Sequence, residues 1–185
     1  MNVYDFDGTM FHGDSEDSFM EYALKHLKIK FRHRFEVKFF YFLRKIKLVN
    51  AQTQRNHTYP YISYIPDIEK IVKDFWDEYE KNIFPYYHEN HRDDDVVVSA
   101  TPRFILKEIV KRLKIKTLIC SEVDLKTGKM IGKMCYADEK ETYYNKVFNK
   151  KPFDNYYFDN DHDMCLLKYA KNGYRVYDGE LKKVK

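Results

Sequence analysis

Two clusters of acidic residues follow short apolar runs that the sequence predicts to be buried strands. The run "NVYDF" leads into Asp5 and Asp7, and the run "NYYF" leads into Asp159, Asp161 and Asp163. In an open α/β sheet, ligands bind beyond the carboxyl ends of the strands, so we expect both clusters at one edge. Carboxylates this close repel one another unless a cation lies between them. Because the available ligands are carboxylate oxygens, the pattern predicts a Mg²⁺ site.

A predicted anion site follows the three valines of "DDDVVVSATP". Ser99, Ala100 and Thr101 lie between this strand and a helix that we expect to run to about Leu113. Unpaired N–H groups and the helix dipole favour an anion at such a junction. Thr101 and Pro102 suit the N-cap and the first position of that helix. We therefore interpret Thr101 as a cap and Ser99 as the residue that contacts the anion.

Lys140 is the basic residue that we associate with this anion site. Asp138 and Glu141 are three residues apart, which resembles a capping box with Asp138 as the N-cap and places Lys140 in the first turn of a helix. The helix dipole disfavours a cation there, and a residue that breaks a local rule is a candidate for function. The alternative is a solvated lysine whose acidic neighbours offset the dipole. Two acidic clusters, an anion site and a lysine together form a phosphate-handling constellation.

Apolar runs and helical spacings alternate along much of the chain. We expect strands at "NVYDF", Val96–Val98, "IKTLIC", "NYYF" and "YRVYDG", and a hairpin around Thr127-Gly128. Further helices are predicted after Asp138 and over Met164–Ala170, the second of them closed by Asn172-Gly173. Strands and helices that alternate in this way predict an α/β fold with a doubly wound parallel sheet.

A long helical block interrupts this alternation after the first strand. Apolar residues recur every three or four positions from about residue 14 to residue 90, with no strand signal among them. One stripe of this block contains Phe31, Phe35, Phe39, Phe42, Ile46 and Val49. A polar stretch from Asn50 to His57 separates it from a helix whose first turn should contain Pro66. We therefore predict an α/β core formed by residues 1–13 and 92–185, with an all-helical cap inserted at residues 14–91.

Composition and charge narrow the class of protein. The chain has 185 residues, of which 44% are hydrophobic and 34% charged, as is usual for a globular domain. The net charge of +4 does not by itself argue for nucleic acid, and we expect no nucleic-acid partner. Cys120, Cys135 and Cys165 lack metal-site spacing, so we expect buried thiols without disulfides. Acids from position 5 and the lack of any long apolar run lead us to predict a cytoplasmic protein.

Taken together, the motifs resemble those of the haloacid dehalogenase-like superfamily of hydrolases. The segment "DFDGT" is similar to its first motif, and the following ones match in order at Ser99, Lys140 and the pair Asp159 and Asp163. The stretch "GKMCYADEK" resembles the "GxxCxGxxK" run of the class IB branch, which contains the phosphoserine-phosphatase-like enzymes. The resemblance spans the whole chain, and the helical insertion looks like the C1-type cap of this superfamily.

The resemblance implies a Mg²⁺-dependent phosphatase that acts on a phosphate monoester. Asp5 would attack phosphorus and form an aspartyl-phosphate, while Asp7 would protonate the leaving oxygen and then deprotonate water. The metal would be held by the Asp5 carboxylate, the Asp7 backbone carbonyl and the Asp159 carboxylate, with Asp163 in support.

The implied phosphate site contains Ser99, Ala100, Lys140, Gly8 and Thr9. The class IB branch usually has Gly where Ala100 and Ala137 stand, and a small polar residue where Asn160 stands, so the fine geometry of this site departs from the family pattern.

Asp14 is the residue through which the resemblance bears on substrate choice. It lies nine residues after Asp5, where phosphoserine phosphatases place a glutamate for the substrate amino group. An acid there implies an amine-bearing or polyol substrate. A helix N-cap beside Ser15 explains Asp14 equally well.

The insertion is also rich in basic residues, which leaves a second kind of partner open. These residues are Lys25, Lys28, Lys30, Arg32, Arg34, Lys38, Arg44, Lys45, Lys47 and Arg55. A charge run of this kind is usually a solvated face, and an aromatic stripe such as that from Phe31 to Phe42 usually lies in the core. The sharper alternative is that "FRHRFEVKFFYFLRKIK" forms a basic amphipathic helix in peripheral contact with an anionic membrane.

Three hypotheses about function follow. The first is a phosphatase for a small-molecule phosphate ester, with a phosphoserine-like substrate as one candidate. The second is a lipid-phosphate phosphatase at a membrane surface, with a phosphatidylglycerophosphate-like substrate. The third is a catalytically silent basic binding module, which loss of Asp5, Asp7 or Asp159 would have indicated; all three are present. The sequence does not predict the oligomeric state.

Overall fold

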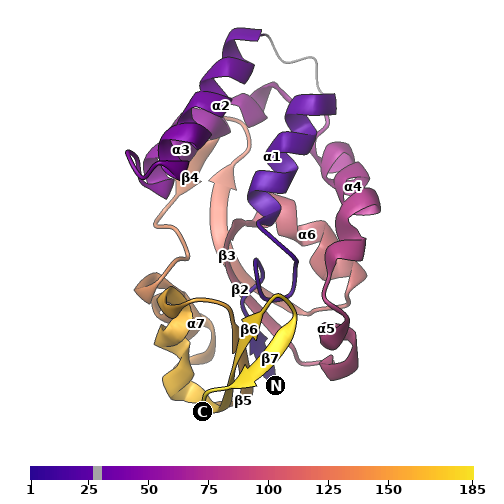
Figure 1. The fold of residues 1–185 in the computed structure, drawn as a ribbon, viewed down its shortest axis with the longest axis vertical. Coiled ribbons are helices and arrows are strands. Elements are labelled where there is room, and N and C mark those ends of the chain that lie inside the picture. The colour runs from indigo at the N-terminus through magenta and orange to yellow at the C-terminus, as the bar shows by residue number, and fades with distance from the viewer. Residues whose placement is uncertain (27–30) are drawn as a thin grey trace.

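A seven-stranded sheet forms the centre of the structure (Figure 1). The computed structural model describes residues 1–26 and 31–185. The strands lie in the order β4-β3-β2-β1-β5-β6-β7 across the sheet. Their bounds are Asn2–Tyr4 for β1, Val96–Pro102 for β2, Thr117–Asp124 for β3, Lys129–Ile131 for β4, Phe153–Phe158 for β5, Ala170–Tyr177 for β6 and Glu180–Lys183 for β7.

The five inner strands are parallel, which confirms the predicted doubly wound sheet. In this register Val3 of β1 lies opposite Val96 of β2 on one side and opposite Tyr156 of β5 on the other. Antiparallel hairpins complete both edges, since β4 pairs with β3 and β7 pairs with β6. Because β1, β2 and β5 run in the same direction, their carboxyl ends meet at one edge of the sheet.

Helices cover both faces of this sheet (Figure 1). On one face Tyr4 and Val97 pack in the same hydrophobic cluster as Phe75, Trp76 and Ile105. On the other face Val3 and Val98 pack with Tyr144 and Leu166. The helices are α1 (Ser15–His26), α2 (Phe31–Lys45), α3 (Ala51–Thr58), η1 (Tyr59–Tyr64), α4 (Ile68–Tyr79), η2 (Glu80–Asn82), α5 (Pro85–Asn90), α6 (Arg103–Arg112), α7 (Asp138–Phe148) and η3 (Asp161–Tyr169).

Aromatic contacts join the helical insertion to the sheet. Trp76 of α4 lies edge-on against Phe6 and Phe11, which follow β1, with ring centroids 6.0 and 5.6 Å away. The Trp76 indole N–H donates a hydrogen bond to the carbonyl of Ile105 in α6, 2.7 Å away. The insertion therefore shares one apolar core with the sheet, at least along α1, α4 and α5.

The junction after β2 differs from the prediction. Thr101 is not a helix cap, because β2 continues to Pro102, and α6 begins at Arg103. The pairing of β2 with β3 shifts between Ser99 and Pro102, and this irregularity lets the strand continue past Ser99.

Within the insertion, the polar stretch from Asn50 to His57 contains α3, in keeping with the predicted helical block, because the Asn50 side chain accepts a hydrogen bond from the Thr53 N–H (2.8 Å) and so starts a helix. The position of Pro66 differs from the prediction. Pro66 lies before α4 rather than in its first turn, since Asp67 is the N-cap and accepts from the Lys70 N–H.

The chain also differs from the prediction after β5. The segment predicted as an α-helix over Met164–Ala170 is the 3₁₀ helix η3, whose N-cap is Asn160. Asn172-Gly173 does not close this helix but lies inside β6, opposite Asn155 and Tyr156 of β5. A further strand, β7, follows the turn after β6.

The aromatic stripe of α2 is not core, contrary to the expectation. Phe35, Phe39, Phe42 and Ile46 are exposed, whereas the side chain of Phe31 lies outside the described part of the molecule. Lys28 and Lys30 lie outside the described residues, as does the side chain of Arg32. In the part of the chain that the structure covers, none of the helices has the length and apolar character needed to cross a bilayer.

The three cysteines are all free. Cys120 and Cys135 are buried as predicted, but Cys165 is only partly buried.

Ala137 starts α7 in a conformation that favours glycine. Its φ is 49° and its ψ is −131°, and it offers no side-chain cap, so Asp138 is the first helical residue rather than the predicted N-cap. Ala100, by contrast, lies within β2. Substitution by glycine should therefore change the free energy of unfolding in opposite directions at Ala137 and Ala100.

We predict that Ala137→Gly raises the free energy of unfolding by about 1 kcal/mol, because strain at such a residue costs on the order of 1–3 kcal/mol. Ala100→Gly should lower it by roughly 0.5–1 kcal/mol, since glycine weakens a strand. Urea unfolding of both variants measures this. A decrease for Ala137→Gly would contradict the strain assigned to Ala137.

Candidate active site

Asp5 stands directly after β1 at the carboxyl edge of the sheet. Its backbone N–H donates a hydrogen bond to the carbonyl of Tyr157 in β5, 2.9 Å away, which fixes the chain beside the neighbouring strand. The residue is buried and lines a cavity of about 870 Å³. Strand pairing thus holds a carboxylate at the floor of a large cavity.

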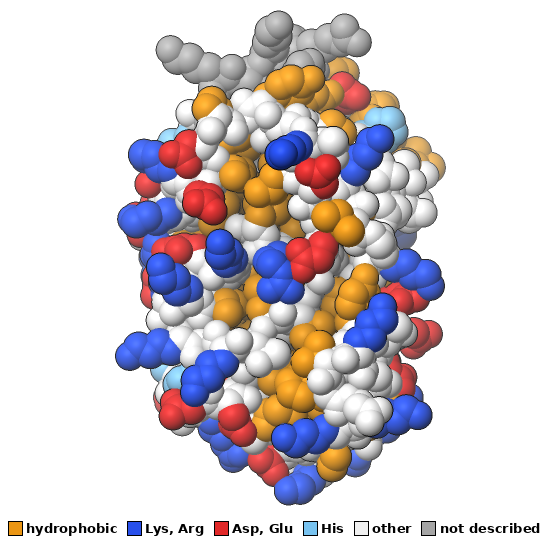
Figure 2. Space-filling view, turned by 180° about the vertical axis from the view of Figure 1, so that it is seen from behind, with side chains coloured by type: hydrophobic (Ala, Val, Ile, Leu, Met, Phe, Trp, Pro, Cys, Tyr) orange, Lys and Arg blue, Asp and Glu red, His pale blue; other side chains and the backbone are white. Residues whose placement is uncertain are grey.

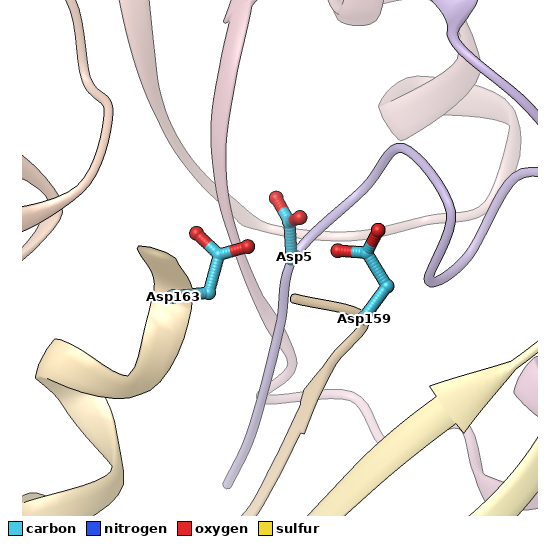
Figure 3. Close-up of side chains that lie close together, drawn as sticks. All are labelled: Asp5, Asp159 and Asp163. Atoms are coloured by element: carbon cyan, nitrogen blue, oxygen red, sulfur yellow. The ribbon is translucent and has the colours of Figure 1, made fainter. Parts of the chain in front are cut away.

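Asp159 and Asp163 complete a three-carboxylate cluster with Asp5 (Figure 3). Carboxylate oxygens of the three side chains all lie within 4.8 Å of one another. Asp159 follows β5 and Asp163 belongs to η3, so three different segments supply the cluster. Asp161 is not part of it: its side chain is 75% exposed and pairs with Arg175 at 2.6 Å. The structure therefore separates the acids that the sequence places together in "DNDHD".

The ammonium group of Lys140 lies inside this cluster. Its Nζ is 2.7 Å from Oδ1 of Asp5 and also forms an ion pair with Asp163. The side chain is only 2% exposed, so the interpretation as a solvated lysine is wrong. Burial alone would lower the pKa of Lys140, but the carboxylates of Asp5 and Asp163 raise it above its ordinary value. The two carboxylates therefore favour the charged form of the buried Lys140 side chain.

One buried cation does not balance three acids. Burial raises the pKa of Asp5 well above its ordinary value, and the charge of Asp163 raises it further, while Lys140 acts in the opposite direction. Burial and the charge of Asp163 also raise the pKa of Asp159. An oxygen-only donor set with excess negative charge fits a hard divalent cation such as Mg²⁺. Asp5, Asp159 and Asp163 are the side chains that could hold it; the Asp7 carbonyl stays a prediction.

Asp7 also lines the cavity but has different hydrogen-bond partners from Asp5. Its Oδ1 accepts a hydrogen bond from the N–H of Ser15 (2.7 Å), and its Oδ2 accepts one from the hydroxyl of Thr101 (2.5 Å). Burial raises the pKa of Asp7 to about 7, with a smaller contribution from the charge of Asp14. Near neutral pH this carboxyl can therefore either donate or accept a proton. Thr101, which we had interpreted as a cap, instead orients Asp7.

Gly8 lets the two acidic segments approach each other. Its φ is +68°, and a Cβ at this position would lie 2.5 Å from Oδ2 of Asp159. Its N–H already donates to the carbonyls of Phe11 and Gly13, at 2.9 and 3.0 Å. Thr9 is fully buried and does not line the cavity, in contrast to the predicted phosphate contact. Its hydroxyl has no hydrogen-bond partner among the described residues.

Ser99 and Ala100 line the cavity beside Lys140. The hydroxyl oxygen of Ser99 accepts a hydrogen bond from the N–H of Thr101, 3.1 Å away, which leaves the hydroxyl hydrogen available to an anion. The structure thus brings Asp5, Ser99, Ala100 and Lys140 together, as the order of motifs predicts.

The helical insertion adds residues that sequence reasoning missed. Glu16 of α1 and Arg55 of α3 form a buried ion pair that lines the cavity, with Arg55 Nε 2.9 Å from Glu16 Oε1. Arg55 also contacts Met134. These partners are 39 residues apart and belong to no local motif. In the sequence, the only indication of this pair was that the two residues carry opposite charges and belong to helices of the same insertion.

Asp14 lines the cavity and also caps α1. Its Oδ1 accepts a hydrogen bond from the Asp17 N–H, 2.8 Å away. This hydrogen bond is the one expected of a helix N-cap. A role of Asp14 in substrate choice stays a prediction.

Comparison with models of known protein families assigns this chain to one of them. A family model described as haloacid dehalogenase-like hydrolase matches residues 3–168. A search of curated proteins found no match.

Several solved structures share the fold. A protein of unknown function from Bordetella pertussis Tohama I has a TM-score of 0.78 and 14% identity, with 94% of this chain and 87% of that chain covered. A phosphoserine phosphohydrolase-like protein from Francisella tularensis subsp. tularensis SCHU S4 has a TM-score of 0.62 and 14% identity over 93% and 84% of the two chains. A phospho-aspartyl intermediate analogue of phosphoserine phosphatase has a TM-score of 0.56 and 18% identity over 93% and 83%.

We predict that Mg²⁺ stabilises the protein and that Asp159→Asn removes this effect. Cation binding to the folded state alone should add roughly 2.7 kcal/mol when Mg²⁺ is at 100 times its Kd. Without Mg²⁺, Asp159→Asn should raise the melting temperature, because it removes one of the repelling carboxylates. Thermal melts with and without Mg²⁺ measure both effects.

Asp161→Asn is the matched control for this measurement. It removes an exposed acid from the same segment and should keep the Mg²⁺-dependent shift of the wild type. An unchanged shift in Asp159→Asn would show that the metal does not bind at this cluster.

Proposed function

Because the chain belongs to the haloacid dehalogenase-like hydrolase family, we propose that it is a Mg²⁺-dependent phosphatase that forms an aspartyl-phosphate at Asp5. The observation that carries the proposal is the buried contact between Oδ1 of Asp5 and Nζ of Lys140, which are 2.7 Å apart. Carboxylate oxygens of Asp159 and Asp163 lie within 4.8 Å of an Asp5 oxygen. A carboxylate nucleophile, a phosphate-binding cation and metal ligands thus share one cavity.

In the first step, a carboxylate oxygen of Asp5 forms a bond to phosphorus and the ester P–O bond breaks. The leaving oxygen takes the proton of Asp7, whose pKa of about 7 suits a general acid. In the second step, the carboxylate of Asp7, which has given up its proton, takes a proton from water. The resulting hydroxide attacks phosphorus, inorganic phosphate leaves, and Asp5 is regenerated.

Lys140 and Ser99 bind the phosphoryl oxygens during both steps. The Lys140 ammonium is buried, so its charge acts at low dielectric and is positioned before the substrate arrives. Bound Mg²⁺ supplies further positive charge that offsets the repulsion between the Asp5 carboxylate and the phosphate. A solved phosphoserine phosphatase that carries a phospho-aspartyl intermediate analogue on a similar fold supports this proposal.

Substrate choice belongs to the helical insertion. We divide the chain into a catalytic core of residues 1–13 and 92–185 and a helical cap of residues 14–91. The cap contributes Glu16, Arg44 and Arg55 to the lining of the cavity. A small phosphate ester with further polar groups, of which phosphoserine is one candidate, fits this lining. A catalytically silent binding module is disfavoured, because such a module has no use for a Lys140 that is buried among three acids.

We predict that Asp5→Asn abolishes hydrolysis of p-nitrophenyl phosphate, because the amide cannot act as the nucleophile. Mg²⁺ chelation should abolish the activity of the wild type reversibly. Release of p-nitrophenol measures both, and Asp161→Asn should retain the activity of the wild type. Near-normal turnover by Asp5→Asn would refute the assignment of the nucleophile.

We expect Asp7→Asn to lower kcat by on the order of 10²–10⁴, the usual contribution of a general acid–base group. The loss should be smallest for substrates with good leaving groups, which need no proton in the first step. Comparing an aryl with an alkyl phosphate tests this role. Because Asp7 is also the proposed base of the second step, the comparison uses the rate of leaving-group release in the first turnover, where an equal loss for both substrates would show that Asp7 is not the general acid.

A further inference from the structure

The outward face of α2 carries a stripe of exposed hydrophobic side chains. Phe35 is 65% exposed, Phe39 44%, Phe42 56% and Ile46 46%. The steps between them are four, three and four residues, so all four lie on one side of the helix. The backbone N–H of Ile46 donates to the carbonyl of Phe42, so Ile46 continues the same helical path. We call these four residues the α2 stripe.

The opposite side of α2 attaches it to the rest of the insertion. Val37 is fully buried, and Tyr41 packs against the same apolar cluster. Phe40 stacks on His57 of α3 with ring centroids 3.8 Å apart, and Arg44 donates to the Gln54 side chain at 3.0 Å. The orientation of α2 is therefore fixed by its inner side, and the α2 stripe has to face outward.

An exposed apolar surface of this kind needs a partner. Contiguous exposed apolar patches on a folded domain mark sites of protein or membrane contact, whereas scattered exposed residues do not. Figure 2 shows hydrophobic side chains among basic and acidic ones in the upper part of the molecule, the end that contains α2 in Figure 1.

The charges around the α2 stripe identify the kind of partner. Arg34, Lys38 and Lys45 follow one border of the stripe along the helix, and both lysines are exposed. The single acid of the segment 31–47 is Glu36, whose carboxylate contacts the Tyr61 hydroxyl and lies 3.9 Å from His57. The outer face therefore combines aromatic residues with positive charge. A second copy of this chain would add the same excess of positive charge to the contact, whereas an anionic lipid surface complements it.

We propose that α2 lies on an anionic phospholipid surface, with the α2 stripe in the interfacial region and its lysines against the headgroups. This arrangement buries aromatic side chains that water otherwise surrounds. It also pairs the basic border with lipid phosphates.

The position of α2 relative to the cavity extends this proposal to the substrate. Arg44, Lys47 and Leu48, at the end of α2 and just beyond it, line the cavity that contains Asp5. Leu48 is 70% exposed, so an exposed apolar side chain also lines the cavity just beyond the end of α2. Docking through α2 brings this rim to the lipid surface. Among phosphate monoesters, the class that follows is one carried on a lipid rather than a free small ester, and this second step rests on the proposed function.

Flotation with vesicles tests the docking step independently of activity. With vesicles of equal parts phosphatidylglycerol and phosphatidylcholine at low salt, we expect the wild type to float. Phe35→Ser/Phe39→Ser should weaken partitioning at least tenfold, since burying one such side chain contributes about 1.5–3 kcal/mol. Lys45→Ser should weaken it about fivefold, as about 1 kcal/mol per basic side chain implies. Val147→Ser, which changes a side chain that is 56% exposed on α7, is the matched control and should float like the wild type.

Three results would overturn the docking proposal. These are failure of the wild type to float at low salt, equal flotation of the Phe35→Ser/Phe39→Ser variant, and conversion of a dimer to a monomer by that variant in size-exclusion chromatography. The last would show that a second copy covers the stripe. Circular dichroism should show all variants folded, because each substitution lies at an exposed position.

Hydrolysis measurements test the substrate step. The wild type should release phosphate from phosphatidic acid in these vesicles, and Phe35→Ser/Phe39→Ser should lose this activity but keep that on p-nitrophenyl phosphate. Equal loss on both substrates, or hydrolysis of the aryl phosphate alone by the wild type, would refute a lipid substrate. If the wild type hydrolyses neither compound, the proposed function fails, while flotation still decides whether α2 docks.

Discussion

The buried ammonium group of Lys140 is the interaction on which the arrangement of the site depends. It joins Asp5, at the end of β1, to Asp163 in η3, and so links three segments at the carboxyl edge of the sheet. Removing one partner of a buried ion pair usually costs about 3–5 kcal/mol, because the other charges stay buried and uncompensated. Lys140 can reach this place only because α7 begins there, and α7 begins at Ala137 with a positive φ. The strained start of the helix is thus part of the support for the charge at the site.

The sheet supplies the second constraint. Parallel pairing of β1 with β2 and β5 brings Asp5, Ser99 and Asp159 to one edge although they are far apart along the chain. Gly8 then allows the first acidic segment to approach Asp159 more closely than any side chain would permit. The extension of β2 past Ser99 places the hydroxyl of Thr101 on Asp7, which holds the proposed general acid–base group apart from the carboxylates around Lys140. Two acids two residues apart therefore have different surroundings and different proposed roles.

The helical insertion connects the site to the outside of the molecule. Its inner side contributes the buried pair of Glu16 and Arg55 to the cavity, while the outer side of α2 exposes Phe35, Phe39 and Phe42. The same helix ends at the rim of the cavity with Arg44. The proposed lipid-docking surface and the proposed substrate cavity are therefore linked through α2, which carries the exposed stripe and supplies Arg44 to the cavity lining.

The sequence by itself determined the five parallel strands, the presence of an inserted helical block, and the gathering of Ser99, Lys140, Asp159 and Asp163 around Asp5, because apolar periodicity and short motifs are local properties of the chain. It could not determine that Thr101 orients Asp7, that Thr9 lies outside the cavity, or that Glu16 pairs with Arg55. The two contacts join distant segments, since Thr101 and Asp7 are 94 residues apart and Glu16 and Arg55 are 39 residues apart. Helical spacing likewise places Phe35, Phe39 and Phe42 on one side of a helix, but it does not say whether that side faces the core. Only the packing of Val37 and Tyr41 against the core decided that the aromatic side faces outward.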